Sequence, residues 1–250
     1  MLPQLVDLTR ALDPSRFFTA ALGYPPDAWQ ARVLRSSSGR IILNCSRQSG
    51  KSTTTACLGL HTALYQPEAL ILMVAPTLRQ SQEVFRKALA AYRALGRPVA
   101  ATAESALSLT LANDARLIAL PGDETTIRSY SGVALLIIDE ASRVPDDVYI
   151  SVRPMVAVSG GKIVLLSTPF GKRGFFYETW ANGSDAWHRE EIPAADCPRI
   201  SADFLDEERD ALGYYYPQEY ENAFLDTTAQ LFATDDIEAA TDPTIAPLWG

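Results

Sequence analysis

The 250-residue chain has few cysteines and histidines, the residue types that build zinc centres and disulfide frameworks. Its three cysteines, Cys45, Cys57 and Cys197, form no C-x-x-C pair. This argues against a cysteine-rich zinc site and against a disulfide-stapled secreted module. The two histidines, His61 and His188, are too few for a histidine-rich metal site. We therefore expect any catalytic or binding site of this chain to be built from side chains other than cysteine and histidine.

Long apolar runs are also missing. The longest uninterrupted run, residues 69–75, is far shorter than the roughly 20 residues of a membrane-spanning helix. The first ten residues, MLPQLVDLTR, lack the basic segment followed by an apolar segment that marks a secretory signal. We therefore expect a protein that is neither membrane-bound nor secreted. Because 47% of its residues are hydrophobic and only 21% are charged, the chain is expected to build a folded core.

The net charge of −8 is unevenly distributed. Residues 191–250 hold 14 acidic and 2 basic residues, whereas residues 1–190 hold 16 acidic and 20 basic residues. A mildly basic first part is where a surface that faces a polyanion would lie. The alternative is that the acidic stretch is a set of solvated helix faces.

Apolar runs alternate with helical patterns over residues 40–167. Continuous apolar strands separated by helices are typical of a parallel sheet that is covered on both faces. The expected strands are 40–45, 69–75, 134–138 and 162–167, with a short pair at 106–111 and 116–120, and the expected helices are 51–65, 78–95 and 146–156. Beyond residue 192 the pattern becomes helical, over 201–212 and 217–224. We therefore expect a core over residues 1–190 and a small subdomain over residues 191–250.

A phosphate-binding loop is predicted where the first of these strands meets its helix. The segment reads Ser46-Arg47-Gln48-Ser49-Gly50-Lys51-Ser52-Thr53. A loop in this position offers backbone N–H groups and a positive helix end to an anion. Lys51 would reach the β- and γ-phosphates of a nucleotide, and the Ser52 hydroxyl would ligate Mg²⁺. Cys45 stands where the G-x-x-x-x-G-K-[ST] pattern has glycine, and its small side chain still lets the loop form.

Two carboxylates, Asp139 and Glu140, follow the apolar strand expected over 134–138. The carboxyl end of a strand is where open α/β sheets bind ligands. Asp139 would hold Mg²⁺ through water, and Glu140 would orient and polarise the attacking water. Together with the phosphate loop, the pair predicts an α/β P-loop NTPase of the ASCE, RecA-like class. That class has a mainly parallel sheet flanked by helices, with a strand inserted between the two motifs.

Further segments narrow this prediction. They are Pro25-Pro26 and Trp29-Gln30, the arginine at position 47, Thr126-Ile127-Arg128, Ser167-Thr168-Pro169 followed by Gly171, Gly174, Phe175 and Trp180, and Pro217-Gln218-Glu219-Tyr220-Glu221-Asn222-Ala223-Phe224. In this order, over residues 24–232, they resemble the ATPase domain of the large terminase subunit of tailed bacteriophages, a motor that packages DNA into a procapsid. In that family the last segment belongs to a small helical lid subdomain.

The resemblance implies roles for five further residues, of which all but Arg47 lie outside the two motifs. Gln30 would hydrogen-bond the adenine edge, and Arg47 would contact the γ-phosphate or report its loss. Arg128 would act as an arginine finger on the ATP of a neighbouring subunit, although the glycine expected after it comes late. Ser167 and Thr168 would sense the γ-phosphate and pass the change to the lid.

Simpler interpretations of these residues stay open. Gln30 and Arg47 are compatible with exposed positions on a helix and a loop, and Arg128 with a structural ion pair. Arg143 is a rival finger that would act within its own subunit. Ser167 and Thr168 are compatible with an ordinary exit from a strand before Pro169.

The resemblance also implies cofactors and partners. ATP and Mg²⁺ would be the cofactors, double-stranded DNA the substrate, and a portal protein and a small terminase subunit the partners. The subunit would be a monomer when free and part of a homo-oligomeric ring when assembled, in the host cytoplasm during virion assembly. The nuclease domain of the family lies outside these residues, so no nuclease activity is expected. The candidates for DNA contact are the basic residues Arg79, Arg86, Lys87, Arg93, Arg97, Lys172 and Arg173.

Three other functions compete with a packaging motor. A helicase-like translocase would normally need a second motor core, and 250 residues hold only one. A P-loop kinase should have an arginine-rich lid, whereas residues 191–250 are acidic. A scaffold that only binds nucleotide has no need of a water-activating carboxylate such as Glu140.

Overall fold

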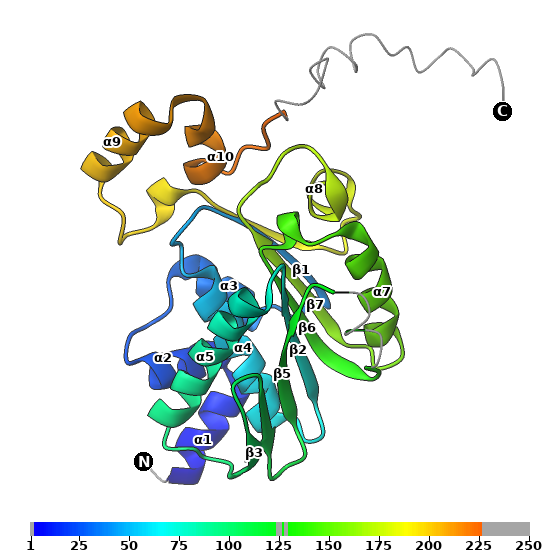
Figure 1. Ribbon diagram of the computed structural model, residues 1–250. Helices are drawn as coiled ribbons and strands as arrows, with labels where there is room; N and C mark the ends of the chain where they lie inside the picture. The colour runs from blue at the N-terminus through cyan, green and yellow to red at the C-terminus, as the bar shows by residue number, and fades with distance from the viewer. Residues whose placement is uncertain (1–2, 124–126, 128–129, 227–250) are drawn as a thin grey trace, which may run out of the picture.

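The structure is a computed structural model that describes residues 3–123, 127 and 130–226. Within these ranges an eight-stranded sheet has the order β3-β4-β5-β2-β6-β7-β1-β8 and carries helices on both faces (Figure 1). The strands are β1 (Arg40–Cys45), β2 (Leu70–Ala75), β3 (Ala101–Glu104), β4 (Ser108–Leu111), β5 (Arg116–Pro121), β6 (Val133–Asp139), β7 (Lys162–Ser167) and β8 (His188–Ile192). All adjacent strands are parallel except β3 with β4 and β4 with β5. The predicted α/β class and mainly parallel sheet are confirmed.

The central strands are buried on both faces, as their uninterrupted apolar runs predict. In β6, Leu135 and Ile137 join one core cluster, whereas Leu136 and Ile138 join the cluster on the opposite face. The first cluster includes residues of α2 (Pro14–Leu22), α3 (Ala28–Arg35), α4 (Lys51–Tyr65) and α5 (Leu78–Ala94), and the second is covered by α7 (Asp146–Ala157) and α8 (Gly174–Asn182) (Figure 1). The first helix, α1 (Pro3–Leu12), packs against α2. No helix within the described ranges is both long and apolar enough to cross a bilayer.

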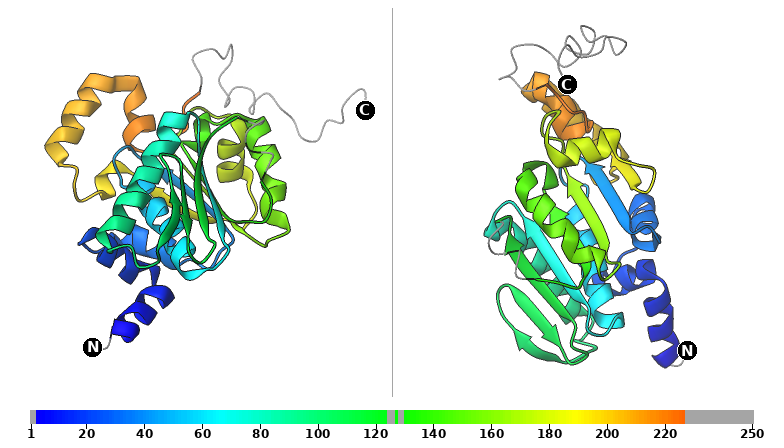
Figure 2. Two further views of the ribbon diagram at one scale, coloured as in Figure 1. Left: turned by 60° about the horizontal axis from the view of Figure 1, so that its bottom comes forward. Right: turned by 90° about the vertical axis from the view of Figure 1, so that its right-hand side faces the viewer.

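The chain after β8 forms a separate small helical part. It comprises η2 (Ala194–Asp196), α9 (Ala202–Leu212), η3 (Gly213–Tyr215) and α10 (Tyr216–Tyr220) around a core of its own. Figure 2 shows α9 and α10 beyond one end of the sheet. The predicted helix over 217–224 is shorter, because the backbone of Asn222 turns into the left-handed region at φ 60° and its carbonyl accepts a hydrogen bond from Asn44 Nδ2.

Two strands, β3 and β8, and several helices are additional to those expected from the sequence. β8 lies parallel to β1 and extends to Ile192, so it crosses the predicted boundary between residues 190 and 191. Its sequence, HREEI, is mostly polar because it lies at the edge of the sheet, where only one neighbour covers it. The order β6-β7-β1 places β7 between the strands that carry the two predicted motifs. This is the inserted strand of the predicted class.

Candidate functional site: a phosphate loop beside two carboxylates

The phosphate loop lies at the carboxyl end of β1 and leads directly into α4. Gln48 and Gly50 have φ of 58° and 93°, so the turn takes its left-handed backbone from these two residues. Cys45 ends β1 as an extended, fully buried residue, and burial raises the pKa of its thiol to about 12. The small cysteine is therefore compatible with the loop, as expected.

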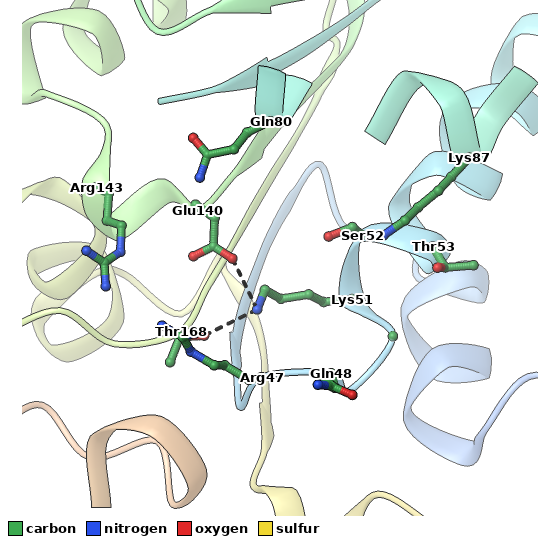
Figure 3. Close-up of a pocket in the computed structure, with 11 residues that line it drawn as sticks. Arg47, Gln48, Lys51, Ser52, Thr53, Gln80, Lys87, Glu140, Arg143 and Thr168 are labelled. Atoms are coloured by element: carbon green, nitrogen blue, oxygen red, sulfur yellow. Dashed lines mark hydrogen bonds and ion pairs between the residues drawn. The ribbon is translucent and has the colours of Figure 1, made fainter. Parts of the chain in front are cut away.

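Lys51 is buried at the start of α4 and points between two acceptors (Figure 3). Its Nζ lies 3.4 Å from Glu140 Oε1 and donates to Thr168 Oγ1 at 3.2 Å. These contacts bring together residues from three parallel strand ends, those of β1, β6 and β7. A buried ammonium with only one carboxylate beside it suits a site that receives further negative charge.

Ser52 and Asp139 form the second pair of the site. The Ser52 hydroxyl donates to Asp139 Oδ2 at 2.7 Å, and Asp139 Oδ1 accepts from the Glu140 N–H at 2.9 Å. Burial, reinforced by the neighbouring charge of Glu140, raises the pKa of the Asp139 carboxyl, while Lys51 and the Ser52 hydroxyl act in the opposite direction. A buried carboxylate oxygen beside a hydroxyl oxygen is the hard donor set that Mg²⁺ prefers.

Glu140 occupies an unusual backbone position. Its φ of 49° turns the chain sharply after β6. Such strain in a residue other than glycine is often found at functional sites. Its Oε2 lies 3.5 Å from Ser167 Oγ, which in turn is 2.7 Å from Ser142 Oγ. Ser142 also donates to the Thr168 carbonyl at 2.8 Å, so the end of β7 is tied to the turn that holds the carboxylate.

An open cavity of about 760 Å³ lies over this constellation. It is lined by Arg47, Gln48, Gly50, Lys51, Ser52, Thr53, Gln80, Lys87, Glu140, Arg143 and Thr168. Of the residues predicted from the sequence, Ser46, Ser49, Gln30, Asp139 and Ser167 lie buried behind its surface.

The structure gives Gln30 and Arg47 specific partners. Gln30 is only 2% exposed, which excludes an exposed helix position. Its Oε1 accepts from the Asp27 N–H at 2.8 Å, and its Nε2 faces Gly50. Arg47 Nε donates to Glu219 Oε2 in a very short ion pair, although the arginine side chain remains 62% exposed. Contact of either residue with a nucleotide stays a prediction.

Arg128 lies outside the described residues, so its predicted role stays untested. Its rival Arg143 lines the cavity, with its guanidinium 4.0 Å from the centre of the Phe170 ring. Figure 3 shows Arg143 and Lys87 on opposite sides of Lys51. Within the described ranges, neither of them has a carboxylate partner. Sequence reasoning missed Gln80 and assigned Lys87 to DNA, because nothing in the pattern shows which face of α5 borders the phosphate loop.

The basic residues predicted to face DNA are mostly engaged with acids. Arg86 pairs with Glu83 at 3.0 Å, and Arg93 and Arg97 both pair with Glu104. Lys172 pairs with Asp226 at 3.5 Å, and Arg173 lies over the Phe170 ring. DNA contact by this group stays a prediction.

Comparisons with known proteins agree with this architecture. Curated large terminase subunits of Thermus virus P23-45 and Thermus phage G20c are 27% and 26% identical over 214 residues. Each alignment covers 78% of this chain and 44% of the relative, so the chain spans less than half the length of these relatives.

Solved structures show the same fold. The large terminase ATPase domain of Thermus phage P74-26 matches with a TM-score of 0.76 at 21% identity, over 86% of this chain and 100% of that one. The large terminase of bacteriophage HK97 matches with a TM-score of 0.70 at 17% identity, over 86% of this chain and 55% of that one. The large terminase of a thermophilic bacteriophage, solved in complex with ADP, matches with a TM-score of 0.65 at 14% identity, over 80% and 54%.

A family profile, described as terminase large subunit, T4likevirus-type, N-terminal, also matches this chain. It covers residues 42–243, which include the phosphate loop, both carboxylates and the small helical part. The chain therefore belongs to the family of terminase large subunits of the T4likevirus type, of which it represents the N-terminal part.

Proposed function

We propose that this chain binds and hydrolyses ATP and that it is the motor domain that drives double-stranded viral DNA into a procapsid. The observation that carries the proposal is the position of Lys51 between Glu140 and Thr168, beside the Ser52–Asp139 pair. Family membership supports the same function, as does the ADP complex of the large terminase from a thermophilic bacteriophage.

The phosphate loop would hold the triphosphate. Residues Ser46 to Thr53 would surround it with backbone N–H groups. Lys51 would exchange part of its contact with Glu140 and Thr168 for contact with the β- and γ-phosphates. Arg47 would reach the γ-phosphate from the edge of the cavity that it lines. Gln30 would hold the base, and Ser167 and Thr168 would sense the γ-phosphate from the end of β7.

The Ser52 hydroxyl and the Asp139 carboxylate fit Mg²⁺, because both are oxygen donors and Asp139 is buried and close to the phosphate loop. When bound, the ion would neutralise phosphate charge that develops during transfer. Asp139 would hold it through water, and Ser52 would contact it directly.

Glu140 would orient and polarise the water that attacks the γ-phosphate. In the structure its carboxylate is 27% exposed and borders the cavity, so water reaches it without a change of the backbone.

The assembly of the motor is a further part of the proposal. Residues 1–190 would form the ATPase core and residues 191–250 the lid. The subunits would be monomers when free and would form a ring with portal protein and small terminase subunit in the host cytoplasm. Arg128 would then complete the site of a neighbouring subunit, an effect worth on the order of a thousandfold in turnover.

Steady-state ATP hydrolysis with and without Mg²⁺ tests the reaction. We expect Mg²⁺-dependent turnover in the wild type, about 100-fold or more slower in Glu140→Gln because general base catalysis is lost. Binding of a fluorescent ATP analogue should persist in Glu140→Gln and be lost in Lys51→Ala. Turnover that is unchanged in Glu140→Gln would contradict the proposed reaction.

Mixing experiments test the shared site. If Arg128 acts between subunits, specific activity should rise with protein concentration, and Arg128→Ala should regain part of its activity when mixed with Glu140→Gln. If activity per subunit is flat and Arg128→Ala matches the wild type, the finger is Arg143 or Arg47 within one subunit.

A further inference from the structure

The chain from β8 onwards contacts the phosphate loop at several of its residues. Ser46 N–H donates to the Ile192 carbonyl at 3.0 Å, and Arg47 N–H donates to the Glu219 carbonyl at 3.4 Å. At the other end of the loop, Arg199 Nη2 donates to the Ser49 carbonyl at 3.1 Å. The conformation of a loop that must fit phosphate oxygens thus depends on residues about 150 positions later in the chain.

Arg199 connects this loop to the segment that precedes α3. It lies between η2 and α9, and its guanidinium forms a bidentate pair with Asp27, with Nη2 2.7 Å from Oδ2 and Nη1 3.2 Å from Oδ1. The same Nη2 donates to the Ser49 carbonyl. A planar guanidinium suits this double contact, because its fork of N–H groups binds both carboxylate oxygens while one nitrogen also donates to a carbonyl.

The contact fixes the orientation of one peptide group. In a trans peptide the C=O and the N–H point in opposite directions, and no peptide bond within the described ranges is cis. Because Arg199 holds the Ser49 carbonyl, the N–H of Gly50 points away from Arg199. Gly50 lines the cavity, and its N–H donates to no protein acceptor among the described residues. This N–H is therefore available to a phosphate oxygen.

Asp27 couples this contact to α3. Asp27 precedes α3, and its N–H donates to Gln30 Oε1 at 2.8 Å. Gln30 Nε2 and Arg199 Nη2 lie 2.9 Å and 3.6 Å from the point where a Cβ on Gly50 would stand. The two side chains therefore pack closely on Gly50, whose φ of 93° favours glycine at this position.

We propose that Arg199 is a positioning residue of the nucleotide site, which holds the Ser49–Gly50 peptide with its N–H directed at the nucleotide phosphates. This inference rests on the proposed function, since it assigns a role in that same site. Arg199 would touch no reacting atom. Because the Gly50 N–H would contact the phosphates equally in the ground state and the transition state, its loss should change KM and leave kcat nearly unchanged.

The test compares Arg199→Ala with Arg209→Ala, a control on α9 with a similar exposed fraction (49% against 55% for the side chains). Arg209 pairs with Asp206 and does not contact the phosphate loop. We expect Arg199→Ala to weaken binding of a fluorescent ADP analogue about tenfold, as for the loss of one charge-assisted hydrogen bond, and to raise KM for ATP equally. Arg209→Ala should bind and hydrolyse as the wild type does.

Arg199→Lys extends the test, because it keeps the positive charge but cannot form the bidentate pair with Asp27 that orients the group towards Ser49. Its affinity should fall between those of the wild type and Arg199→Ala. If both Arg199 variants bind the ADP analogue as tightly as Arg209→Ala does, the inference is wrong, whatever happens to their melting temperatures. ADP binding needs no turnover, so a wild type that binds ADP without hydrolysing ATP would refute the proposed reaction and leave the effect of Arg199 measurable.

Discussion

Arg47 of the phosphate loop forms an ion pair with Glu219 of α10, and the Arg47 N–H also donates to the Glu219 carbonyl at 3.4 Å. The Glu219 side chain is 15% exposed, whereas that of Arg47 is 62% exposed. The arginine is therefore the movable partner. Because Arg47 also lines the cavity, a γ-phosphate would compete with Glu219 for its guanidinium.

This competition predicts an opposite effect of the two partners on ATP affinity. Removing the charge of Glu219 in Glu219→Gln should tighten ATP binding by up to about fivefold, the range of a pair that is partly exposed to solvent. Arg47→Ala should weaken it. ADP binding should change little in either variant, because ADP has no γ-phosphate. Titration of each variant with ATPγS and with ADP measures both effects.

The double variant Arg47→Ala/Glu219→Gln is the control. If Glu219 acts by holding Arg47, its substitution has no effect once Arg47 is absent, so the double variant should equal Arg47→Ala. Additive effects of the two substitutions would show that Glu219 acts on the lid alone and would contradict the competition.

Lys87 provides a second prediction about the cavity. It lines the cavity from α5 without a carboxylate partner in the described part of the chain, whereas its neighbour Arg86 faces solvent and pairs with Glu83. We expect Lys87→Ala to raise KM for ATP about three- to tenfold through the loss of one cationic contact. Arg86→Ala is the matched control and should leave KM unchanged. Equal KM values for the two variants would show that Lys87 makes no contact with the nucleotide.

The elements that bear the chemistry were predictable because they combine a local motif with a simple apolar run. β1, α4, β6 and β7 were expected within one residue of their observed ends, since buried parallel strands have unbroken apolar sequences. β8 was not predicted, because four of its five residues are polar, which suits an edge strand but resembles a loop in the sequence.

Side-chain partners across the fold were beyond sequence reasoning. Arg47 and Glu219 were both named from motifs, yet nothing in the sequence places α10 against the phosphate loop. Arg199 belongs to no motif at all, and its contact with Ser49 depends on how the chain after β8 folds back. Such contacts follow from tertiary packing over a separation of about 150 residues, which local patterns do not encode.

His61 predicts a pH dependence of stability. It is packed on α4 against Phe17 and Tyr65, and its Nε2 lies 3.1 Å from the Arg10 carbonyl. Burial lowers the pKa of its imidazole below the ordinary 6.5, although the backbone carbonyls and Asp13 act in the opposite direction. The unfolded chain therefore binds the proton more readily, so stability should fall as the pH decreases through 6.5 towards the folded pKa.

Urea midpoints of the wild type and of His61→Gln at about pH 8, 7, 6 and 5 measure this effect. The wild type should lose stability between about pH 7 and pH 5, and the variant should lose less over the same interval because glutamine does not titrate. The comparison of the two slopes removes the contribution of the carboxylates that both proteins share. Parallel slopes would mean that His61 is not the titrating group.

Gly161 predicts a large loss of stability from one methyl group. A Cβ on Gly161 would stand 2.1 Å from the Val133 carbonyl oxygen and 3.0 Å from that of Ala134, both of them backbone atoms of β6. The two strands would have to move apart, so Gly161→Ala should cost about 2–3 kcal/mol of unfolding free energy.

Gly39 is the matched control, because it precedes β1 as Gly161 precedes β7 and its Cβ would meet no atom within 4 Å. Gly39→Ala should leave stability unchanged or raise it by about 0.5 kcal/mol, since alanine restricts the unfolded chain. Urea unfolding of both variants decides the point: equal midpoints would show that β6 and β7 can separate at this end of the sheet without loss, and the tight register of the strands that carry Asp139 and Ser167 would then not depend on Gly161.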